Sequence, residues 1–143
     1  MLFLDRNGDG TVSGVAELSF VDDLPGATSD LAGLRAFDSN GDGALDQADA
    51  QFASFGVWRD DNGDGAVGAG ETLSLTDAGV AAIGLGGAPV TATVGLGDVI
   101  AINEGQFVRA DGSSGLLLDA ALAYAPTPSL VVLNWSASAS FAF

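Results

Sequence analysis

Three segments of the sequence carry oxygen-bearing side chains at alternate positions, each followed by a glycine. They are DRNGDG from Asp5, DSNGDG from Asp38 and DDNGDG from Asp60. Calcium binds six to eight hard oxygens at short range, so a compact turn that points several such side chains inward suits it. Glycine at position six permits the positive φ of the sharp bend. The spacing therefore predicts three calcium-binding loops of the EF-hand type.

The second and third loops follow the calcium pattern D-x-[DN]-x-[DN]-G-x5-E most closely. The predicted ligands of the third loop are Asp60, Asn62, Asp64, the carbonyl of Ala66 and the closing carboxylate Glu71, with room for a water at Gly68. Those of the second loop are Asp38, Asn40, Asp42, the carbonyl of Ala44, Asp46 and Asp49. Asp49 replaces the closing Glu and is one methylene shorter, so the backbone there must approach the ion more closely.

The first loop departs from this pattern at its end. Its predicted ligands are Asp5, Asn7, Asp9, the carbonyl of Thr11, Ser13 and Glu17. Position twelve is Ala16, and Glu17 follows one place late. Gly14 allows a wider turn through which Glu17 reaches the ion, and the preceding segment LFL (2–4) predicts a strand rather than a helix. We therefore predict a variant calcium site, the weakest of the three.

The acidic balance of the chain agrees with a cation as its ligand. Its 143 residues suit a single domain and include 19 acidic and 4 basic residues, for a formal net charge of −15. Eleven of the acidic residues lie in the three loops. Nucleic acid is excluded as a partner because no basic patch could meet phosphates. The uncharged stretch 78–97 is too rich in Gly to predict a membrane span, and 120–143 is broken by Pro126 and Pro128.

The absence of Cys and His excludes several kinds of chemistry. It removes disulfides, thiolate nucleophiles, histidine general bases and most zinc sites. Nothing beyond the loop carboxylates resembles a catalytic set. The chain is therefore expected not to be an enzyme, and its expected cofactor is Ca²⁺, with two to three ions.

The apolar pattern predicts an α+β fold in which short helices flank EF-hand-like loops and a β-hairpin-rich part follows. Helices are expected over 28–37, 46–55 and 74–85, where large apolar residues recur at helical spacing. Thr28 or Ser29 is expected to cap the first helix, because both side chains can accept a hydrogen bond from the first turn.

Two contacts of the β type are also expected. Position eight of each loop is apolar, as Val12, Leu45 and Val67, and in paired loops this residue forms a short β-bridge to its neighbour. Leu45 pairs with either Val67 or Val12, and the sequence leaves both pairings open. Residues 99–118 predict two strands around a turn at Asp111-Gly112.

The domain organisation follows from this change of pattern along the chain. One calcium-binding module is expected over 1–124, with loops and helices in 1–85 and a β-rich part in 86–124. The tail, 125–143, alternates polar and apolar residues, which predicts an edge strand or an export signal.

Taken together, the residues resemble a known family of calcium-binding regions. The landmarks are LDRNGDG…AEL, FDSNGDGALDQADAQFASFGVWRDDNGDGAVGAGE, LTDAGVAAIGL and GQFVRADGSSG, in this order. Over about residues 2–124 the chain resembles the non-repeat, hemolysin-type region around the self-processing module of iron-regulated RTX proteins. The resemblance implies calcium binding, type I secretion and folding outside the cell when calcium is met. In that family the first of these loops also carries its glutamate one residue late.

The resemblance does not extend to the self-processing reaction. That reaction cuts an Asp-Pro bond, whereas the four prolines here follow Leu24, Ala88, Ala125 and Thr127. The RTX nonapeptide array and the calcium loops expected upstream are also absent, which suggests a partial or shortened unit. Autocatalysis is therefore not expected.

Three functional hypotheses follow from these observations. The leading one is a secreted, extracellular module that folds or becomes rigid on binding calcium and has a structural or interaction role, with its protein partner open. The alternative is a dockerin-like docking module, favoured by the 22-residue spacing of loops two and three and by Asp49, and disfavoured by the β-rich part. The third is a remnant of a calcium-activated self-processing peptidase.

Overall fold

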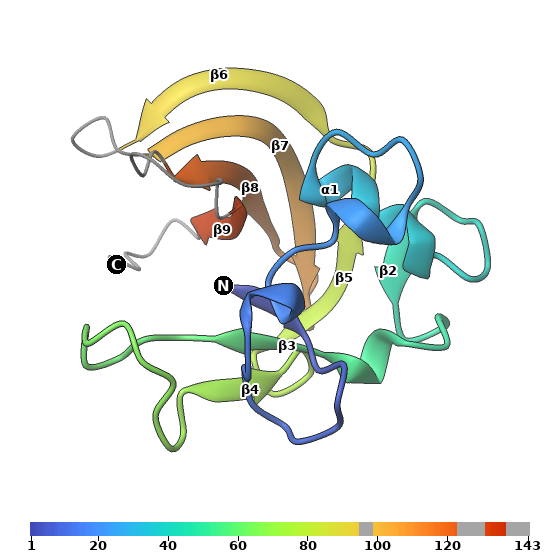
Figure 1. Ribbon diagram of the computed structural model, residues 1–143. Helices are drawn as coiled ribbons and strands as arrows, with labels where there is room; N and C mark the ends of the chain where they lie inside the picture. The colour runs from blue at the N-terminus through green and yellow to red at the C-terminus, as the bar shows by residue number, and fades with distance from the viewer. Residues whose placement is uncertain (95–98, 123–130, 137–143) are drawn as a thin grey trace.

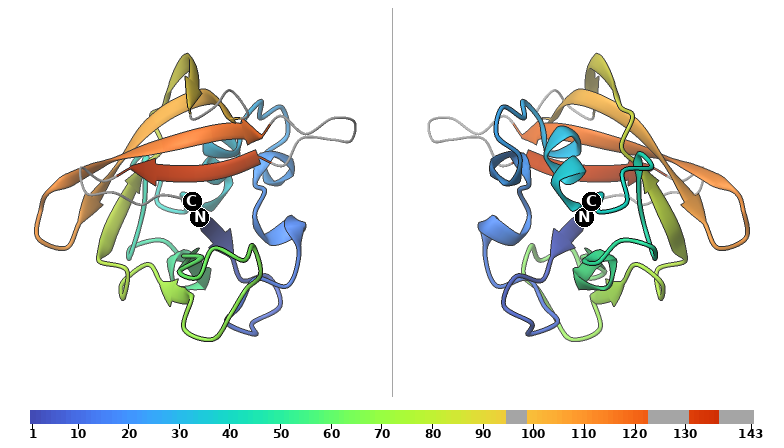
Figure 2. Two further views of the ribbon diagram at one scale, coloured as in Figure 1. Left: turned by 90° about the vertical axis from the view of Figure 1, so that its left-hand side faces the viewer. Right: turned by 90° about the vertical axis from the view of Figure 1, so that its right-hand side faces the viewer.

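Two antiparallel β-sheets dominate the computed structural model, which describes residues 1–94, 99–122 and 131–136 (Figure 1). The smaller sheet has the order β1-β3-β4, with β1 at Leu2–Leu4, β3 at Phe55–Trp58 and β4 at Thr72–Ser74. The larger sheet has the order β2-β5-β7-β8-β9, and β6 also pairs with β7. Its strands are β2 (Ala44–Asp46), β5 (Val80–Gly84), β6 (Ala88–Val94), β7 (Val99–Arg109), β8 (Ser114–Leu122) and β9 (Val131–Ser136). Figure 2 shows the larger sheet above the smaller one, with the loops of the smaller sheet below both.

The described residues contain little helix, so the predicted α+β fold class is wrong. The one α-helix of the described residues, α1, covers Asp30–Gly33, and four 3₁₀ turns complete the helical content. These turns are η1 (Val15–Glu17), η2 (Val21–Asp23), η3 (Leu34–Phe37) and η4 (Phe52–Ser54). The fold is mostly β, and each of the three loops adjoins or contains a strand, although η3 leads into loop two. Propensity and spacing favour helices only weakly, and sheet pairing overrides them.

The helix predicted over 46–55 is a turn followed by a strand. The N–H of Asp49 donates to the carbonyl of Asp46 at 2.9 Å, and the N–H of Asp46 donates to the Asp49 carboxylate at 2.9 Å. These bonds close the chain into a tight turn before η4. Gly56 does not end a helix but lies in β3, where an added Cβ would stand 2.5 Å from the ring of Phe3. The two sheet neighbours of Gly56 therefore decide the structure of this segment.

The helix predicted over 74–85 is also wrong, because it divides into a turn and the strand β5. The N–H of Val80 donates to the carbonyl of Leu75 at 2.8 Å, and Gly79 adopts φ 74° to complete the turn. Beyond the turn, Ile83 and Leu85 are two residues apart and both are buried, which is strand spacing. Pairing of β5 with both β2 and β7 then fixes the strand.

The helix predicted over 28–37 is confirmed in part, as α1 followed by η3. Ser29 is its cap, since its Oγ accepts a hydrogen bond from the N–H of Ala32 at 3.1 Å. An added Cβ at Gly33 would lie 1.9 Å from the carbonyl oxygen of Phe20, so only glycine allows this approach. Leu31 of α1 packs onto the larger sheet. A Cβ added to Gly105 of β7 would lie 3.0 Å from the Cδ2 of Leu31.

The predicted hairpin over 99–118 is confirmed as β7 and β8. Gly112 has φ 83°, and the N–H of Ser113 donates to the Asp111 carboxylate at 2.8 Å, so Asp111-Gly112 forms the expected turn. In the tail, β9 pairs with β8 and stands last in the strand order of the larger sheet. Residues 125–130 and 137–143 of the predicted edge strand or export signal lie outside the described residues. β2 and β5 share this sheet with β7 and β8, so the larger sheet joins residues before and after 85.

The core lies between the two sheets and is centred on Phe55. Its ring centroid stands 5.8 Å from that of Phe20 and 5.1 Å from that of Phe37. Phe55 begins β3, whereas Phe20 and Phe37 flank the segment between loops one and two. The core thereby ties that segment to the smaller sheet, and Leu45 and Ile83 extend it to the larger one. No helix in the described residues has the length and apolar character needed to cross a membrane.

Candidate metal centres

The first Asp of each loop organises its turn in the same way. Its carboxylate accepts hydrogen bonds from the backbone N–H groups of positions four, five and six, at 2.7 to 3.2 Å. The donors are Gly8, Asp9 and Gly10 to Asp5, Gly41, Asp42 and Gly43 to Asp38, and Gly63, Asp64 and Gly65 to Asp60. Three N–H donors stabilise a carboxylate and fix its direction. The shared sequence of the loops therefore produces one shared backbone structure.

Positions three and five repeat this arrangement. The amide oxygen at position three accepts from the N–H of position five, and the carboxylate at position five accepts from the N–H of position seven. The acceptors are Asn7, Asn40 and Asn62 in the first case and Asp9, Asp42 and Asp64 in the second, all at 2.8 to 2.9 Å. Each side chain is thus folded back over its own loop. The oxygens predicted as ligands are gathered on one short turn in each loop.

Glycine is required twice in each loop. The second glycine, at position six, has φ of 75° in Gly10, 85° in Gly43 and 71° in Gly65, as the motif predicts. The glycine at position four also adopts positive φ, and its N–H is among the donors to the first Asp. The second G in N-G-D-G therefore makes the predicted bend, while the first brings its N–H to the carboxylate.

The three closing carboxylates occupy equivalent places. Glu17, Asp49 and Glu71 each accept a hydrogen bond from the N–H of position nine, at 2.7, 2.9 and 2.7 Å. Glu17 and Asp49 also accept from the N–H of position two, at 3.1 and 2.7 Å. All three side chains are buried, with 5 to 6% of their surface exposed. Glu17 therefore closes its loop as Asp49 and Glu71 close theirs, although it comes one residue late.

The turn η1 explains how Glu17 reaches this place. The N–H of Glu17 donates to the carbonyl of Gly14 at 3.1 Å, and this 3₁₀ turn takes up the additional residue. Gly14 itself has φ −176°, an extended conformation open to any residue. The wider turn was predicted correctly, but it does not depend on the freedom of glycine.

The loops differ at position nine. In loop one, the Ser13 hydroxyl donates to Asp9, and this bond is the main cause that lowers the pKa of Asp9 below its usual range. In loop two, the Asp46 carboxylate accepts from the N–H of Ala48 at 2.8 Å and so faces its own turn. Burial raises the pKa of Asp49, but the N–H groups of Asp46 and Ser39 and the Ser39 hydroxyl together leave it lowered.

The predicted bridge between loops is wrong. Leu45 pairs with Ile83 of β5, and the N–H of Leu85 donates to the carbonyl of Gly43 at 2.9 Å. Val12 and Val67 lie outside any strand and are half-buried. Loop two is therefore built into the larger sheet. The reason is the nearby strand β5, which offers a longer ladder than one loop residue can.

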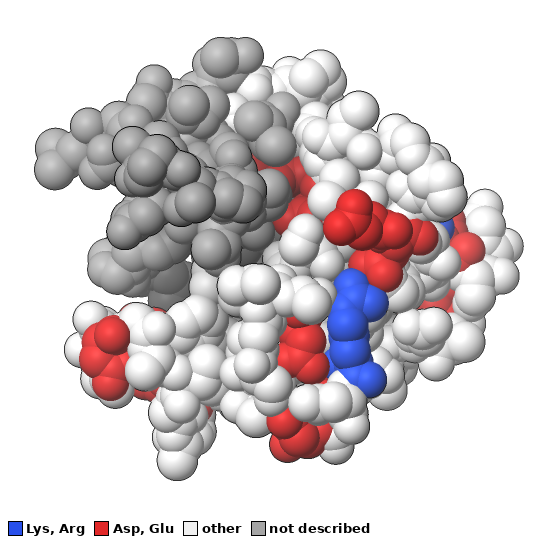
Figure 3. All heavy atoms as spheres, viewed as in Figure 1, with Lys and Arg blue, Asp and Glu red and all other residues white. Residues whose placement is uncertain are grey.

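Loops one and three belong instead to the smaller sheet. Loop one follows β1, and loop three connects β3 to β4. The Thr72 hydroxyl at the start of β4 donates to the carbonyl of Gly10 at 3.1 Å, which joins the two loops. Asp61 is not turned into loop three, because its carboxylate pairs with Arg59 at 2.6 Å. Figure 3 shows acidic side chains in several groups over one face of the molecule, with few basic ones.

The donor set of each loop fits calcium, because it consists of hard oxygens alone. A carboxylate oxygen that accepts one N–H keeps a lone pair for an ion. No group of three or more His, Cys, Asp or Glu side chains in the described ranges could hold an ion by itself. An ion in one of these loops would therefore need amide and carbonyl oxygens beside the carboxylates. Asn7, Asn40 and Asn62 and the carbonyls of position seven are placed on the same turns as the carboxylates.

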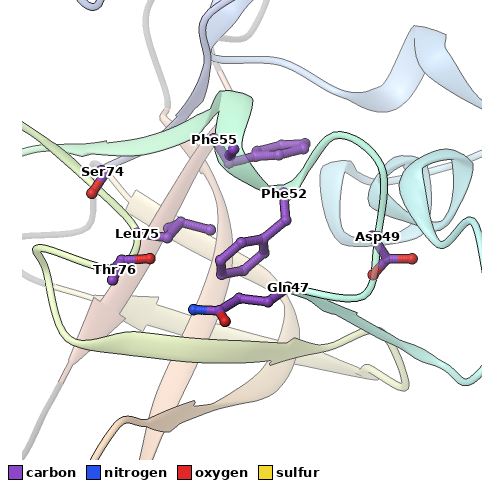
Figure 4. Close-up of a pocket in the computed structure, with 8 residues that line it drawn as sticks. Gln47, Asp49, Phe52, Phe55, Ser74, Leu75 and Thr76 are labelled. Carbon is purple, nitrogen blue, oxygen red and sulfur yellow. The ribbon is translucent and has the colours of Figure 1, made fainter.

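A pocket beside loop two was not predicted. Phe52, Leu75 and Gln47 turn toward one another in it, while the carboxylate of Asp49 lies apart, on the side of loop two (Figure 4). Ala53, Phe55, Ser74 and Thr76 complete the lining. Its walls come from segments predicted to be helices, so only the turn and strand that replace them create it.

Comparison with known proteins points to one family. The model of the SPM domain matches residues 1–123. The chain is also 33% identical over 127 residues to a protein named iron-regulated protein FrpA, from Neisseria meningitidis serogroup C. That match covers 86% of this chain and 11% of the FrpA sequence, so the chain spans about a tenth of the length of this relative. The SPM match, over residues 1–123, spans all three loops.

Proposed function

Because this chain belongs to the SPM domain family, we propose that it is a calcium-binding module that folds or becomes rigid when it meets extracellular Ca²⁺. Its role is structural or interactive within a secreted RTX-type protein, and it has no enzyme activity of its own. The observation that carries this proposal is the equivalence of the three closing carboxylates, Glu17, Asp49 and Glu71, over three turns of one structure. The relative named iron-regulated protein FrpA supports the assignment to the RTX type.

The net negative charge of the chain explains why calcium favours the folded state. Without a cation, the carboxylates of each loop repel one another in a chain of net charge −15, and this repulsion opposes the compact state. An ion that binds only the folded loop stabilises it by about 1.4 kcal/mol at ten times its Kd. Three such sites contribute roughly 4 kcal/mol, a large part of a typical stability of about 5–15 kcal/mol. Calcium affinities of about 10⁻⁴–10⁻³ M suffice outside the cell.

The ion count tests this proposal directly. Native mass spectrometry of the metal-stripped chain, titrated with calcium, is expected to show two to three bound ions. Terbium is expected to luminesce when Trp58 is excited, because Trp58 ends β3 two residues before Asp60. Trp58→Phe should remove the part of the signal that comes from loop three. A chain that takes up no ion in millimolar calcium would refute the proposal.

Glu17→Gln is expected to remove or weaken one calcium site. The amide keeps an oxygen for the N–H of Ser13, but the hydrogen bond from the N–H of Arg6 and the charge that faces the ion are lost. Asp49→Asn is the matched change in loop two and should give a similar loss. Asp61→Asn is the control, because Asp61 is exposed and pairs with Arg59. Calorimetric titration measures all three variants, and an unchanged affinity and stoichiometry in Glu17→Gln would exclude Glu17 as a ligand.

A further inference from the structure

Two carboxylates outside the loops are fully buried where α1 meets β8. Asp30 begins α1 and Asp119 lies in β8, and both side chains have 0% of their surface exposed. The N–H of Leu31 donates to Oδ2 of Asp119 at 3.0 Å, which brings α1 against β8. One oxygen of each carboxylate, Oδ2 of Asp30 and Oδ1 of Asp119, has no hydrogen-bond partner. A buried acceptor without a partner carries a large free-energy cost, so this arrangement calls for an explanation.

The other carboxylate oxygen of Asp30 accepts three hydrogen bonds. Its Oδ1 accepts from the N–H groups of Phe20 and Val21, at 2.7 and 2.9 Å, and from the hydroxyl of Ser19 at 3.1 Å. Asp30 thereby ties α1 to the segment that follows loop one. Together with Asp119, it connects three distant parts of the chain: residues 19–21, the start of α1 and β8.

The basic side chains near this pair of carboxylates bond to other groups. On the elements packed against the pair, η2 carries Asp22 and Asp23, η3 carries Arg35, and β7 carries Glu104. Asp23 pairs with Arg6 at 2.6 Å, and Arg35 donates to the carbonyl of Leu85 at 3.1 Å. Asp22 and Glu104 are exposed. The nearby charges are therefore either acidic or directed to other partners.

We propose that Asp30 and Asp119 together bind one proton and form a latch, operated by pH, that fastens α1 to β8. A single proton taken up by the pair removes one negative charge from the interior. The oxygen that carries it becomes a hydroxyl, which can donate a hydrogen bond as well as accept one. In the doubly ionised state the two buried charges repel one another, and the latch is weakened.

A proton suits this site better than a metal ion. The groups that meet the pair are donors: the N–H groups of Leu31, Phe20 and Val21 and the hydroxyl of Ser19. Calcium requires six to eight oxygens as ligands, and the three N–H groups cannot supply any. The two free carboxylate oxygens alone are too few for such an ion but sufficient for a proton.

Both pKa values move in the direction that the latch requires. Burial raises the pKa of Asp30 to about 6, and the charge of Asp119 adds to this rise against the N–H donors. Burial also raises the pKa of Asp119. The folded pKa of Asp30 lies above the unfolded value of 3.8, so the folded state binds more protons between these values. Stability is therefore expected to fall as pH rises through about 4 to 6 and to stay low above pH 6. The proton affinity of Asp30 in the folded chain is then on the order of a hundredfold above that of an exposed Asp.

Asp30→Asn is the first test, with the full chain in saturating calcium. The amide keeps an oxygen for the donors of Asp30 and places an NH₂ donor where Oδ2 was, so it mimics the protonated latch at every pH. The melting temperature of Asp30→Asn is expected to exceed that of the wild type at pH 7.5, and the difference should shrink as pH falls below about 6 and vanish below the unfolded pKa of 3.8. Asp22→Asn, on the adjacent η2, is the matched control and should show no such pH-dependent difference.

Carbon-13 NMR of the aspartate carboxyl groups in the wild-type chain provides an independent measurement. One carboxyl is expected to titrate near pH 6, and this signal should be absent in Asp30→Asn. Three results would overturn the latch: two carboxyl groups that both stay ionised down to pH 4, a stability difference that does not depend on pH, or a bound-ion count that falls by one in Asp30→Asn. The last result would assign the pair to a metal ion instead.

Discussion

Removal of calcium is expected to convert the chain from the two-sheet structure into a largely disordered one. Loop one follows β1, loop three joins β3 to β4, and loop two leads into β2, so each sheet depends on at least one loop. The carboxylates that calcium neutralises belong to a chain with 19 acidic and 4 basic residues. Loss of roughly 4 kcal/mol from three sites at ten times Kd is comparable with the whole stability of a marginal domain.

Far-UV circular dichroism of a metal-stripped sample, first in chelator and then in rising calcium, measures this change. The β signal is expected to appear between about 0.1 and 10 mM calcium, the range for extracellular modules of such affinity. Magnesium at the same ionic strength is the control, because it requires near-ideal octahedral geometry and gives up its waters reluctantly. A spectrum that is the same in chelator and in calcium would contradict calcium-dependent folding, even if the ion count showed binding.

Leu45→Ala is expected to destabilise the chain by about 2–5 kcal/mol, the usual range for a buried Leu→Ala change. Leu45 has 0% of its surface exposed, belongs to the core and pairs with Ile83. The cavity would open where loop two joins the larger sheet, so the calcium affinity of loop two should fall with the stability. Urea denaturation in saturating calcium measures the first effect, and calorimetric titration measures the second.

Val12→Ala and Val67→Ala are the matched controls, because these residues hold the same position eight in loops one and three. Both are half-buried and outside any strand, so each is expected to cost about 1 kcal/mol or less. If all three substitutions cost the same, position eight would have one role in every loop. That outcome would contradict the separate attachment of loop two to the larger sheet.

The local structure of the loops could be predicted from the sequence, because it rests on contacts within a few residues. Asp5, Asn7 and Asp9 bond to N–H groups two to five residues away, and the same spacing gives the same turn in loops two and three. The cap at Ser29 and the turn at Asp111 are equally local. These features depend on side-chain chemistry and backbone sterics that neighbouring residues set.

The partners of the loops could not be predicted in this way. Leu45 was expected to meet another loop, yet it meets Ile83, which lies in a segment whose apolar spacing fits a helix as well as a strand. The choice depends on β7, because β5 pairs with that strand on its other side. Periodicity in a short apolar segment does not distinguish a helix from a strand when distant pairing decides.

The sequence by itself determined the three loop turns, the acidic side chains gathered on them, the hairpin around Asp111 and the family of the chain, since each depends on residue type at short spacing. The tertiary structure decided that strands replace the predicted helices, that Glu17 reaches the same place as Asp49 and Glu71, and that Asp30 meets Asp119. The physical reason is the same in each case. Sheet pairing and burial join residues far apart in the chain, and the free energy of these contacts exceeds the weak local preference of a short segment.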